Sequence, residues 1–245
     1  MVNYNKIHWH KLFNDKSFKY NVLSKNLKNI TSYNLAKIIY PDLTRNKFSK
    51  ITNFIIRNIN LIKKKKLLDF GSGNGAFLIF FQNKVKKLYS LDVSRNLINF
   101  QKKILFNTKY ILTSPYNGNF FKKIKDNEVD ITISNSVFQY FYSDAYCKKI
   151  LNEMIRTTRD QIFIYDIKNK NKKNKFIETV RKRQKLSKKE FYNKYKNTPQ
   201  RFYKKSFFIL FLKKKYPELK FKFINLPKEA TDSNFGFCLK ITKQH

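Results

Sequence analysis

Residues 66–81 read Lys-Leu-Leu-Asp-Phe-Gly-Ser-Gly-Asn-Gly-Ala-Phe-Leu-Ile-Phe-Phe. A short apolar segment closes with Asp69, three alternating glycines follow, and a second apolar run continues without Pro or Gly, as in a helix. A strand, a tight glycine turn and a helix form a unit that cradles a nucleotide. Glycine is needed because the turn adopts unusual backbone angles and lets a ligand lie against the main chain. The new helix presents free N–H groups to that ligand.

Two nucleotide-binding patterns fit this loop. Gly71, Gly73 and Ala76 match the dinucleotide pattern with Ala in the last position. Asp69 with Gly71, Gly73 and Gly75 instead matches Asp-x-Gly-x-Gly-x-Gly. The loop alone does not decide between the two patterns, so the order of the elements that follow has to decide.

The length and composition predict one folded α/β domain in the cytoplasm. The chain has 245 residues and 42% hydrophobic residues, enough for a full core. No apolar run approaches the roughly 18–20 residues of a membrane span, and the N-terminus lacks the pattern of a signal peptide. Cys147 and Cys238 lack the spacing of metal ligands, so we expect neither a metal site nor a disulfide framework.

The chain is strongly basic, with 53 Lys and Arg residues, 16 acidic residues and a formal net charge of +37. Such a charge suggests nucleic acid as a partner. However, Lys, Asn, Ile, Phe and Tyr are abundant while Gly, Pro and Trp are scarce, as an A/T-rich genome would produce. We therefore favour codon bias as the main source of the charge, although the surface would still attract anionic partners.

An N-terminal helical cap is expected over residues 1–60. Helices are predicted at 6–13, 31–40 and 44–59 from the spacing of their apolar residues. No flexible linker separates this cap from the main domain, which we place at residues 61–245.

The rest of the chain alternates predicted strands and helices. Strands are expected at 67–69, 87–92, 110–113, 129–134, 161–166, 220–225 and 235–242. Five strands alternating with helices, followed by a terminal pair, predict a doubly wound, Rossmann-like α/β sheet of seven strands.

Residues 168–205 form a basic insertion. We expect an exposed loop at 168–175 and a basic helix at 176–195. The apolar run at 206–216 is flanked by lysines, which also suits an interfacial membrane helix, but a buried crossover helix is favoured.

With these elements in place, residues 67–242 resemble the class I S-adenosylmethionine-dependent methyltransferases. The motifs that carry the resemblance are Asp69-Phe-Gly-Ser-Gly-Asn-Gly75, the strand-end Asp92, and Ser134-Asn-Ser-Val-Phe-Gln139. The resemblance implies an antiparallel last strand and S-adenosyl-L-methionine as cofactor. Nicotinamide dehydrogenases usually continue into a substrate domain, for which almost no chain is left. Residues 201–208 and 234–241 are loosely similar to methyltransferases found among bacterial surface-polysaccharide genes.

The resemblance also implies a cofactor site. Its residues are Asp69, Gly71, Ser72, Gly73, Asn74, Gly75, Asp92 and Asn135. Asp92 lies about twenty residues past the loop, where a carboxylate accepts the ribose hydroxyls; the alternative is a helix-capping Asp. Asn135 lies where the fourth strand usually meets the methionine amine, or it is a simple turn residue. Ser114 stands where such enzymes often have an acid or amide beside adenine, so the sequence departs from the family there.

Methyl transfer is a displacement at a sulfonium methyl group, for which the protein supplies alignment and electrostatics. Candidate bases for an oxygen nucleophile are His8, His10 and Asp166. The alternatives are histidines of the surface or core, and an Asp that caps the segment after the fifth strand.

The acceptor class is narrowed by two absences from the sequence. No Asn-Pro-Pro-Tyr-like segment, which nucleic-acid enzymes that methylate amines tend to have, follows the fourth strand. No Pro-Cys pair, which cytosine-C5 enzymes use as a nucleophile, is present. The sequence therefore favours transfer to an oxygen, or a nitrogen, of a small-molecule or glycan-precursor acceptor. The alternatives are a nucleic-acid methyltransferase that uses the basic residues 168–196 and their aromatics, and a cofactor-binding module without turnover. Peripheral contact with an anionic membrane is a further expectation.

Overall fold

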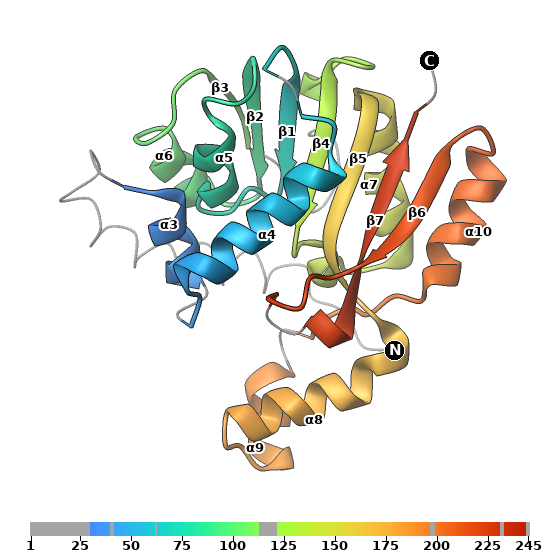
Figure 1. Cartoon of the computed structure of the whole chain (residues 1–245). Helices are drawn as coiled ribbons and strands as arrows, with labels where there is room; N and C mark the ends of the chain where they lie inside the picture. The colour runs from blue at the N-terminus through green and yellow to red at the C-terminus, as the bar shows by residue number, and fades with distance from the viewer. Residues whose placement is uncertain are drawn as a thin grey trace.

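A seven-stranded sheet in the order β3-β2-β1-β4-β5-β7-β6 is the frame of the molecule. The computed structural model (Figure 1) describes residues 30–39, 42–61, 63–112, 122–196, 199–230 and 233–243. The strands are β1 Lys66–Phe70, β2 Lys87–Asp92, β3 Thr108–Leu112, β4 Val129–Asn135, β5 Thr158–Lys168, β6 Lys220–Asn225 and β7 Gly236–Thr242. Strands β1 to β5 pair in parallel, and β7 runs antiparallel to both β5 and β6. The predicted sheet with its antiparallel last strand is therefore confirmed.

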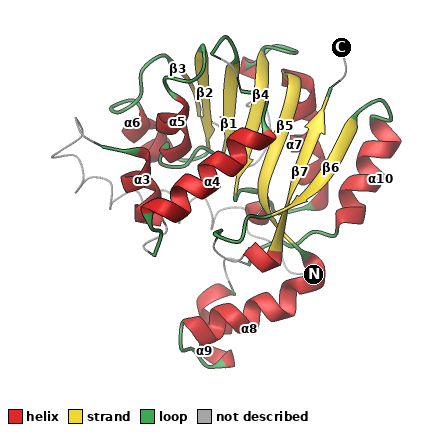
Figure 2. Ribbon diagram, viewed as in Figure 1, coloured by secondary structure: helices red, strands yellow, loops and turns green. Residues whose placement is uncertain are grey.

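Helices cover both faces of this sheet (Figure 2). They are α3 Ser32–Ile39, α4 Arg45–Asn58, α5 Ala76–Phe81, α6 Arg95–Gln101, α7 Asp144–Thr157, α8 Lys173–Arg183, α9 Lys188–Tyr195 and α10 Lys205–Lys215, with short 3-10 turns η3 Phe138–Tyr140, η4 Lys170–Lys172 and η5 Ser233–Phe235. Helices α4 and α5 contribute to the apolar cluster on one face, and α7 and α10 contribute to the cluster on the other.

The alternation of side chains along the strands divides the core into these two clusters. Leu67 and Leu68 are adjacent in β1, and they belong to opposite clusters because successive strand residues point to opposite faces. Six of the seven residues of β4 are buried, as expected for a parallel strand covered on both faces. Asn135, the last residue of β4, is only half-buried and marks the open end of the sheet.

The start of helix α6 is fixed by a capping side chain. Ser94 accepts a hydrogen bond at 3.3 Å from the N–H of Leu97, so it satisfies one of the free donors at the helix start. Thr44 does the same for α4 through the N–H of Lys47.

The described part of the N-terminal segment is helical and packs on the glycine-turn unit. Leu35 of α3 and Phe48 of α4 are buried in one cluster with Ala76, Leu97 and Phe100. The helix predicted at 6–13 lies outside the described residues, and the boundary at residue 60 stays a prediction.

The region after β5 differs from the prediction. The fifth strand was expected to end at Asp166 and a loop to follow, but β5 continues to Lys168, which pairs with Gly236 of β7 and is buried. Helix α8 then begins at Lys173, within the expected loop. The single basic helix predicted at 176–195 is interrupted by a turn between α8 and α9. The Lys- and Asn-rich composition concealed the last residues of the strand.

The apolar helix α10 packs against the sheet, as predicted. Phe208 and Leu212 are fully buried in the cluster that also contains Phe237 and Leu239 of β7. Among the described residues, no helix has both the length and the apolar character needed to cross a membrane.

Candidate active site

The loop between β1 and α5 has three glycines in the left-handed region. The φ angles of Gly71, Gly73 and Gly75 are 73°, 56° and 81°. Any other L-residue is strained there, which explains the alternating glycines. The N–H groups of Gly71 and Ser72 donate to the carbonyl of Leu91 at 2.8 and 3.2 Å, so the loop is fastened to the end of β2.

The first two glycines of the loop face different surroundings. A Cβ atom on Gly71 would lie 2.4 Å from Cγ2 of Val137, whereas a Cβ on Gly73 would meet nothing within 4 Å. Gly71 is therefore required by packing against the segment after β4. Gly73 leaves open space above bare main chain, where a ligand can approach.

A buried amide fixes the shape of this loop from beneath. Nε2 of Gln101 in α6 donates to Oγ of Ser72 at 3.0 Å and to the carbonyl of Gly73 at 2.7 Å. Its Oε1 accepts from Oγ of Ser90 at 2.5 Å. The hydroxyl of Ser72 therefore takes part in an internal network, and Gln101 is a positioning residue that no sequence motif indicated.

Asn74 joins the loop to the N-terminal helices. Its Nδ2 donates to the carbonyl of Leu35 in α3 at 2.6 Å, and its Oδ1 accepts from the N–H of Ala76 at 3.3 Å. Because the Asn74 side chain holds the loop against α3, the cap and the loop are structurally coupled.

Asp92 lies at the end of β2, beside the loop. Its Oδ2 accepts from the N–H of Gly73 and its Oδ1 from the N–H of Ser94, both at 2.8 Å. Burial raises the pKa of Asp92 to about 6, against the opposing effect of these backbone donors. Each carboxylate oxygen has a second lone pair, so Asp92 can still accept hydrogen bonds from a ligand. The carboxylate thus braces the loop and remains suited to the predicted ribose contact.

Asp69 is a second buried acid under the loop. It is 2% exposed, and its pKa is raised to about 8, first by burial and then by the charge of Asp92. None of the ion pairs found among the described residues involves either carboxyl group. Two buried acids that pair with no cation from the described segments favour a ligand that brings positive charge.

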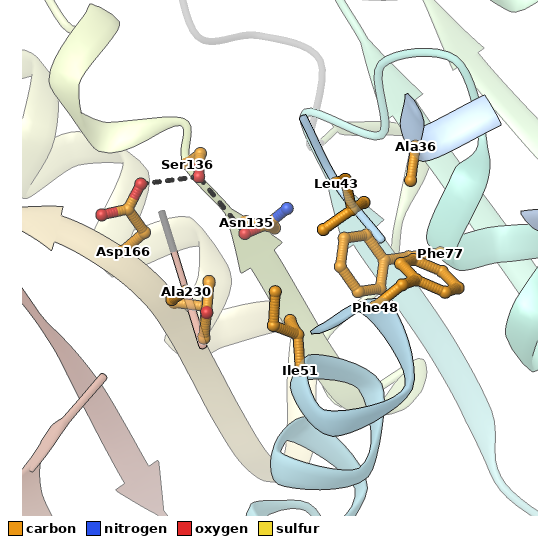
Figure 3. Close-up of a pocket in the computed structure, with 10 residues that line it drawn as sticks. Ala36, Leu43, Phe48, Ile51, Phe77, Asn135, Ser136, Asp166 and Ala230 are labelled. Carbon is orange, nitrogen blue, oxygen red and sulfur yellow. Dashed lines mark hydrogen bonds between the residues drawn. The ribbon is translucent and has the colours of Figure 1, made fainter. Parts of the chain in front are cut away.

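A hollow that is open to solvent lies at the ends of β4 and β5 (Figure 3). Leu43, Phe48 and Phe77 form an apolar wall on one side. Asn135 lies between this wall and the polar pair Ser136 and Asp166. The hollow therefore offers an apolar surface and hydrogen-bonding groups to the same ligand.

Asp166 is held in the hollow by an ion pair and an unusual backbone. Nζ of Lys168 lies 3.0 and 3.1 Å from its two carboxylate oxygens, and Oγ of Ser136 donates to its Oδ2 at 2.8 Å. Its φ is 59°, and the pairing of β5 with β7 shifts register between Ile164 and Ile167. A strained residue persists only where its surroundings fix it, and such residues cluster at functional sites.

Glycine on β7 makes room for this carboxylate. A Cβ on Gly236 would lie 2.9 Å from Oδ1 of Asp166 and 2.8 Å from Cδ1 of Leu226. Strand β7 therefore has a glycine at a position where any side chain would collide with Asp166.

The structure brings most of the predicted residues to one edge of the sheet. The glycine loop, Asp92, Asn135 and Asp166 all lie at or beside the carboxyl ends of parallel strands, where ligands bind in such sheets. Their roles as site residues stay predictions. His8, His10 and Ser114 lie outside the described residues.

Several residues of the site were missed by the sequence reasoning. They are Leu43, Phe48, Phe77, Gln101, Ser136 and Lys168. Ser136 stood in a quoted motif without a role, and Lys168 was assigned to the expected loop.

Comparisons with known proteins agree with this geometry. The family described as "Methyltransferase domain" matches residues 61–219. No curated protein sequence matches the chain. Three similar solved structures share the fold at low sequence identity, as follows.

Magnesium protoporphyrin IX methyltransferase from Synechocystis PCC 6803 with bound SAH has a TM-score of 0.60 and 10% identity, over 98% of this chain and 99% of that chain. Phosphoethanolamine N-methyltransferase 1 from Haemonchus contortus has a TM-score of 0.60 and 13% identity, over 95% of this chain and 49% of that chain. An S-adenosylmethionine-dependent methyltransferase from Clostridium acetobutylicum has a TM-score of 0.58 and 12% identity, over 85% of this chain and 96% of that chain.

The family match spans well over half of the chain, and the fold and the glycine loop agree with a methyltransferase that uses S-adenosylmethionine. The chain therefore belongs to the methyltransferase-domain family and is a class I S-adenosylmethionine-dependent methyltransferase.

Proposed function

We propose that this methyltransferase acts on an oxygen, or a nitrogen, of a small-molecule acceptor that binds in the hollow at the ends of β4 and β5. The observation that carries the proposal is the hollow itself, which places Asn135 and Asp166 opposite the apolar side chains of the cap. A ligand with a hydroxyl or amino group on an apolar body fits such a surface.

The residues around the loop fit S-adenosylmethionine. Open main chain at Gly73 allows close approach of the ligand, and Asp92 can accept the ribose hydroxyls. The buried acids Asp69 and Asp92 suit a ligand that carries an ammonium and a sulfonium group. Asn135 ends β4 at the place expected for the methionine part. When bound, the cofactor supplies an electrophilic methyl group, and the protein aligns it with the acceptor.

Of the three candidate bases, Asp166 is the one that lies among the described residues, and we expect it to contact the acceptor. Its carboxylate lines the hollow and is oriented by Ser136 and Lys168. It would accept a hydrogen bond from the acceptor hydroxyl and take up the proton as the oxygen–carbon bond forms and the sulfur–carbon bond breaks. Lys168 balances the negative charge of Asp166 before the reaction. In this state Asp166 orients the acceptor through the hydrogen bond, and it takes up the proton only during methyl transfer.

The acceptor class is proposed only to this level. The similar structures include enzymes named for magnesium protoporphyrin IX and for phosphoethanolamine, which share little chemistry with each other. A glycan precursor, suggested by the loose resemblance of residues 201–208 and 234–241, stays a prediction. The cytoplasmic location is likewise a proposal.

Calorimetric titration tests the cofactor site. S-Adenosylmethionine should bind and NAD should not. Asp92→Ala should weaken S-adenosylmethionine binding by about 1–3 kcal/mol, because the ribose hydroxyls lose their acceptor. Asp126→Ala is the control, since that exposed carboxylate pairs with Arg156 and both residues precede the starts of β4 and β5, at the opposite ends of these strands from the loop. Equal affinities of wild type and Asp92→Ala would remove Asp92 from the site.

Asp166→Asn tests the acceptor side. The variant keeps the size of the side chain but cannot take up a proton, so we expect turnover to fall by at least about a hundredfold. S-Adenosylmethionine affinity should stay unchanged. The measurement is release of S-adenosylhomocysteine in a screen of hydroxyl- and amine-bearing acceptors. A variant with full turnover would exclude Asp166 as a base and leave only a structural role for its ion pair.

A further inference from the structure

The two helices α8 and α9 with their turn, residues 173–196, form a strongly basic projection that we call the α8–α9 hairpin. Ten of its 24 residues are Lys or Arg and two are Glu. In the whole chain 53 of 245 residues are Lys or Arg, so the hairpin is about twice as rich in them. A codon bias that acts on the whole chain does not by itself explain this local excess.

The hairpin extends from the edge of the sheet that carries the glycine loop (Figure 1). Its base is anchored by an apolar cluster in which Phe176 and Val180 of α8 pack with Phe235. The two helices are joined by a hydrogen bond of 2.7 Å from Nε2 of Gln184 to the hydroxyl of Tyr195. The hairpin therefore has a defined structure, and its charges keep fixed relative positions.

Both acidic residues of the hairpin are used within it. Glu178 pairs with Arg181 on the same helix at 2.8 Å. Glu190 accepts from the N–H of Ser187 at 2.7 Å, which closes the capping box of α9. Exposed lysines at 182, 185, 188 and 189 cluster around the turn between the helices. The turn thus presents concentrated positive charge to solvent.

Three of these lysines occupy positions that do not favour lysine. Lys185 follows the end of α8 with a φ of 55°, where glycine or asparagine is preferred. Lys188 and Lys189 are in the first turn of α9, where the helix dipole favours negative charge. Helix stability therefore does not account for positive charge at this turn, whereas a bound anion would.

An exposed aromatic ring lies on the same hairpin. Tyr192 is 68% exposed, and it is the only large hydrophobic residue exposed in the hairpin. Aromatic rings interleaved with lysines suit single-stranded nucleic acid, because bases stack on the ring while phosphates contact the cations. A helix that inserts into a membrane surface would instead expose several large apolar side chains.

We propose that the α8–α9 hairpin binds single-stranded nucleic acid, with phosphates on the lysines of its turn and a base stacked on Tyr192. This binding does not require the methyl-transfer reaction, so it stands whatever the acceptor is.

The test compares two triple variants that remove the same charge. Lys185→Gly with Lys188→Gln and Lys189→Gln changes the turn of the hairpin. Lys63→Gln, Lys64→Gln and Lys213→Gln is the control, because these exposed lysines lie before β1 and in the last turn of α10, outside the hairpin. The probe is a labelled single-stranded RNA of about 20 nucleotides, followed by fluorescence anisotropy at several salt concentrations.

We expect the hairpin variant to bind the RNA at least about tenfold more weakly, and its log–log salt slope to fall by about 2 because three phosphate contacts are lost. Its melting temperature should rise, since the strained backbone at 185 and the unfavourable charges at 188 and 189 are removed. The control variant should bind nearly as wild type does. Loss of affinity with a gain in thermal stability separates a binding role from damage to the fold.

Tyr192 gives a second readout. Tyr192→Ala should weaken RNA binding by about tenfold, while Tyr192→Phe should retain it, because stacking needs only the ring. Equal weakening in the two triple variants, or no RNA binding by wild type at low salt, would overturn the proposal. So would hairpin-dependent binding to vesicles of phosphatidylcholine and phosphatidylglycerol in the absence of RNA binding.

Discussion

Gly71→Ala is expected to destabilise the fold by about 4 kcal/mol, measured by denaturant unfolding in the absence of cofactor. Two costs add up at this position. The φ of 73° strains any residue with a Cβ, by about 1–2 kcal/mol. The new methyl group would also lie 2.4 Å from Cγ2 and 3.0 Å from Cγ1 of Val137, and such overpacking costs about 1–3 kcal/mol.

Gly73→Ala is the matched control for this prediction. Its φ of 56° imposes a similar backbone strain, but its Cβ would meet nothing within 4 Å, so we expect a loss of only about 1–2 kcal/mol. The new methyl group would enter the space proposed for the cofactor and weaken S-adenosylmethionine binding. Adding Val137→Ala should recover part of the stability of Gly71→Ala and none of that of Gly73→Ala. Equal unfolding free energies for the two single variants would contradict the assigned contacts.

The sequence predicted the parts of the site that depend on local backbone chemistry. Three alternating glycines, an acid at the end of β1 and another at the end of β2 identify the loop, because only certain residues tolerate its angles. Strands β2 and β6 were predicted with the bounds that the structure shows, and α5 begins where the apolar run after the glycines predicted a helix. Short-range rules of turn, cap and alternation were sufficient for these elements.

The parts that the sequence did not predict depend on contacts between distant segments. Lys168 became a buried strand residue because Asp166 offers it a partner within the core, which a run of Lys and Asn does not indicate. Gln101 reaches the loop from α6 across 28 positions to Gly73. Phe48 lines the hollow because α4 packs on the glycine-turn unit through the cluster that contains Ala76. Apolar residues of the cap were identifiable as core, but not as the wall of a ligand site.

The two sides of the proposed site differ in the same way, because one depends on local sequence and the other on contacts between distant segments. The proposed cofactor side is built from one continuous segment and the strand beside it, so its residues follow from a single motif. The proposed acceptor side is the hollow, which combines the cap, the ends of β4 and β5 and the link between β6 and β7. Such a surface varies with each contributing segment, and the acceptor therefore has to be found by experiment.

Without cofactor, the enzyme is expected to lose stability as pH rises from about 4 to about 8, through the titration of Asp69. The pKa of Asp69 is raised from 3.8 to about 8, so in this interval the folded chain holds a proton that the unfolded chain has released. The group therefore contributes its full stabilisation below pH 3.8 and loses it as pH rises through the folded-state pKa. At about 1.36 kcal/mol for each pH unit, the total is roughly 6 kcal/mol.

Asp69→Asn isolates this effect from the other carboxyl groups. An amide keeps the shape of the protonated acid and has no proton to release, so the difference in unfolding free energy between variant and wild type should grow with pH. Above pH 8 the variant should be the more stable protein without cofactor, and the wild type should be the more stable one with S-adenosylmethionine. The positive charge of the cofactor stabilises ionised Asp69 in the wild type, and the variant has no charge at this position. Denaturant unfolding at a series of pH values, with and without cofactor, measures both effects. Parallel pH profiles for the two proteins without cofactor would show that Asp69 is already ionised in the folded state. That result would contradict the proposal that a cationic ligand stabilises Asp69 by ionising a buried, protonated acid.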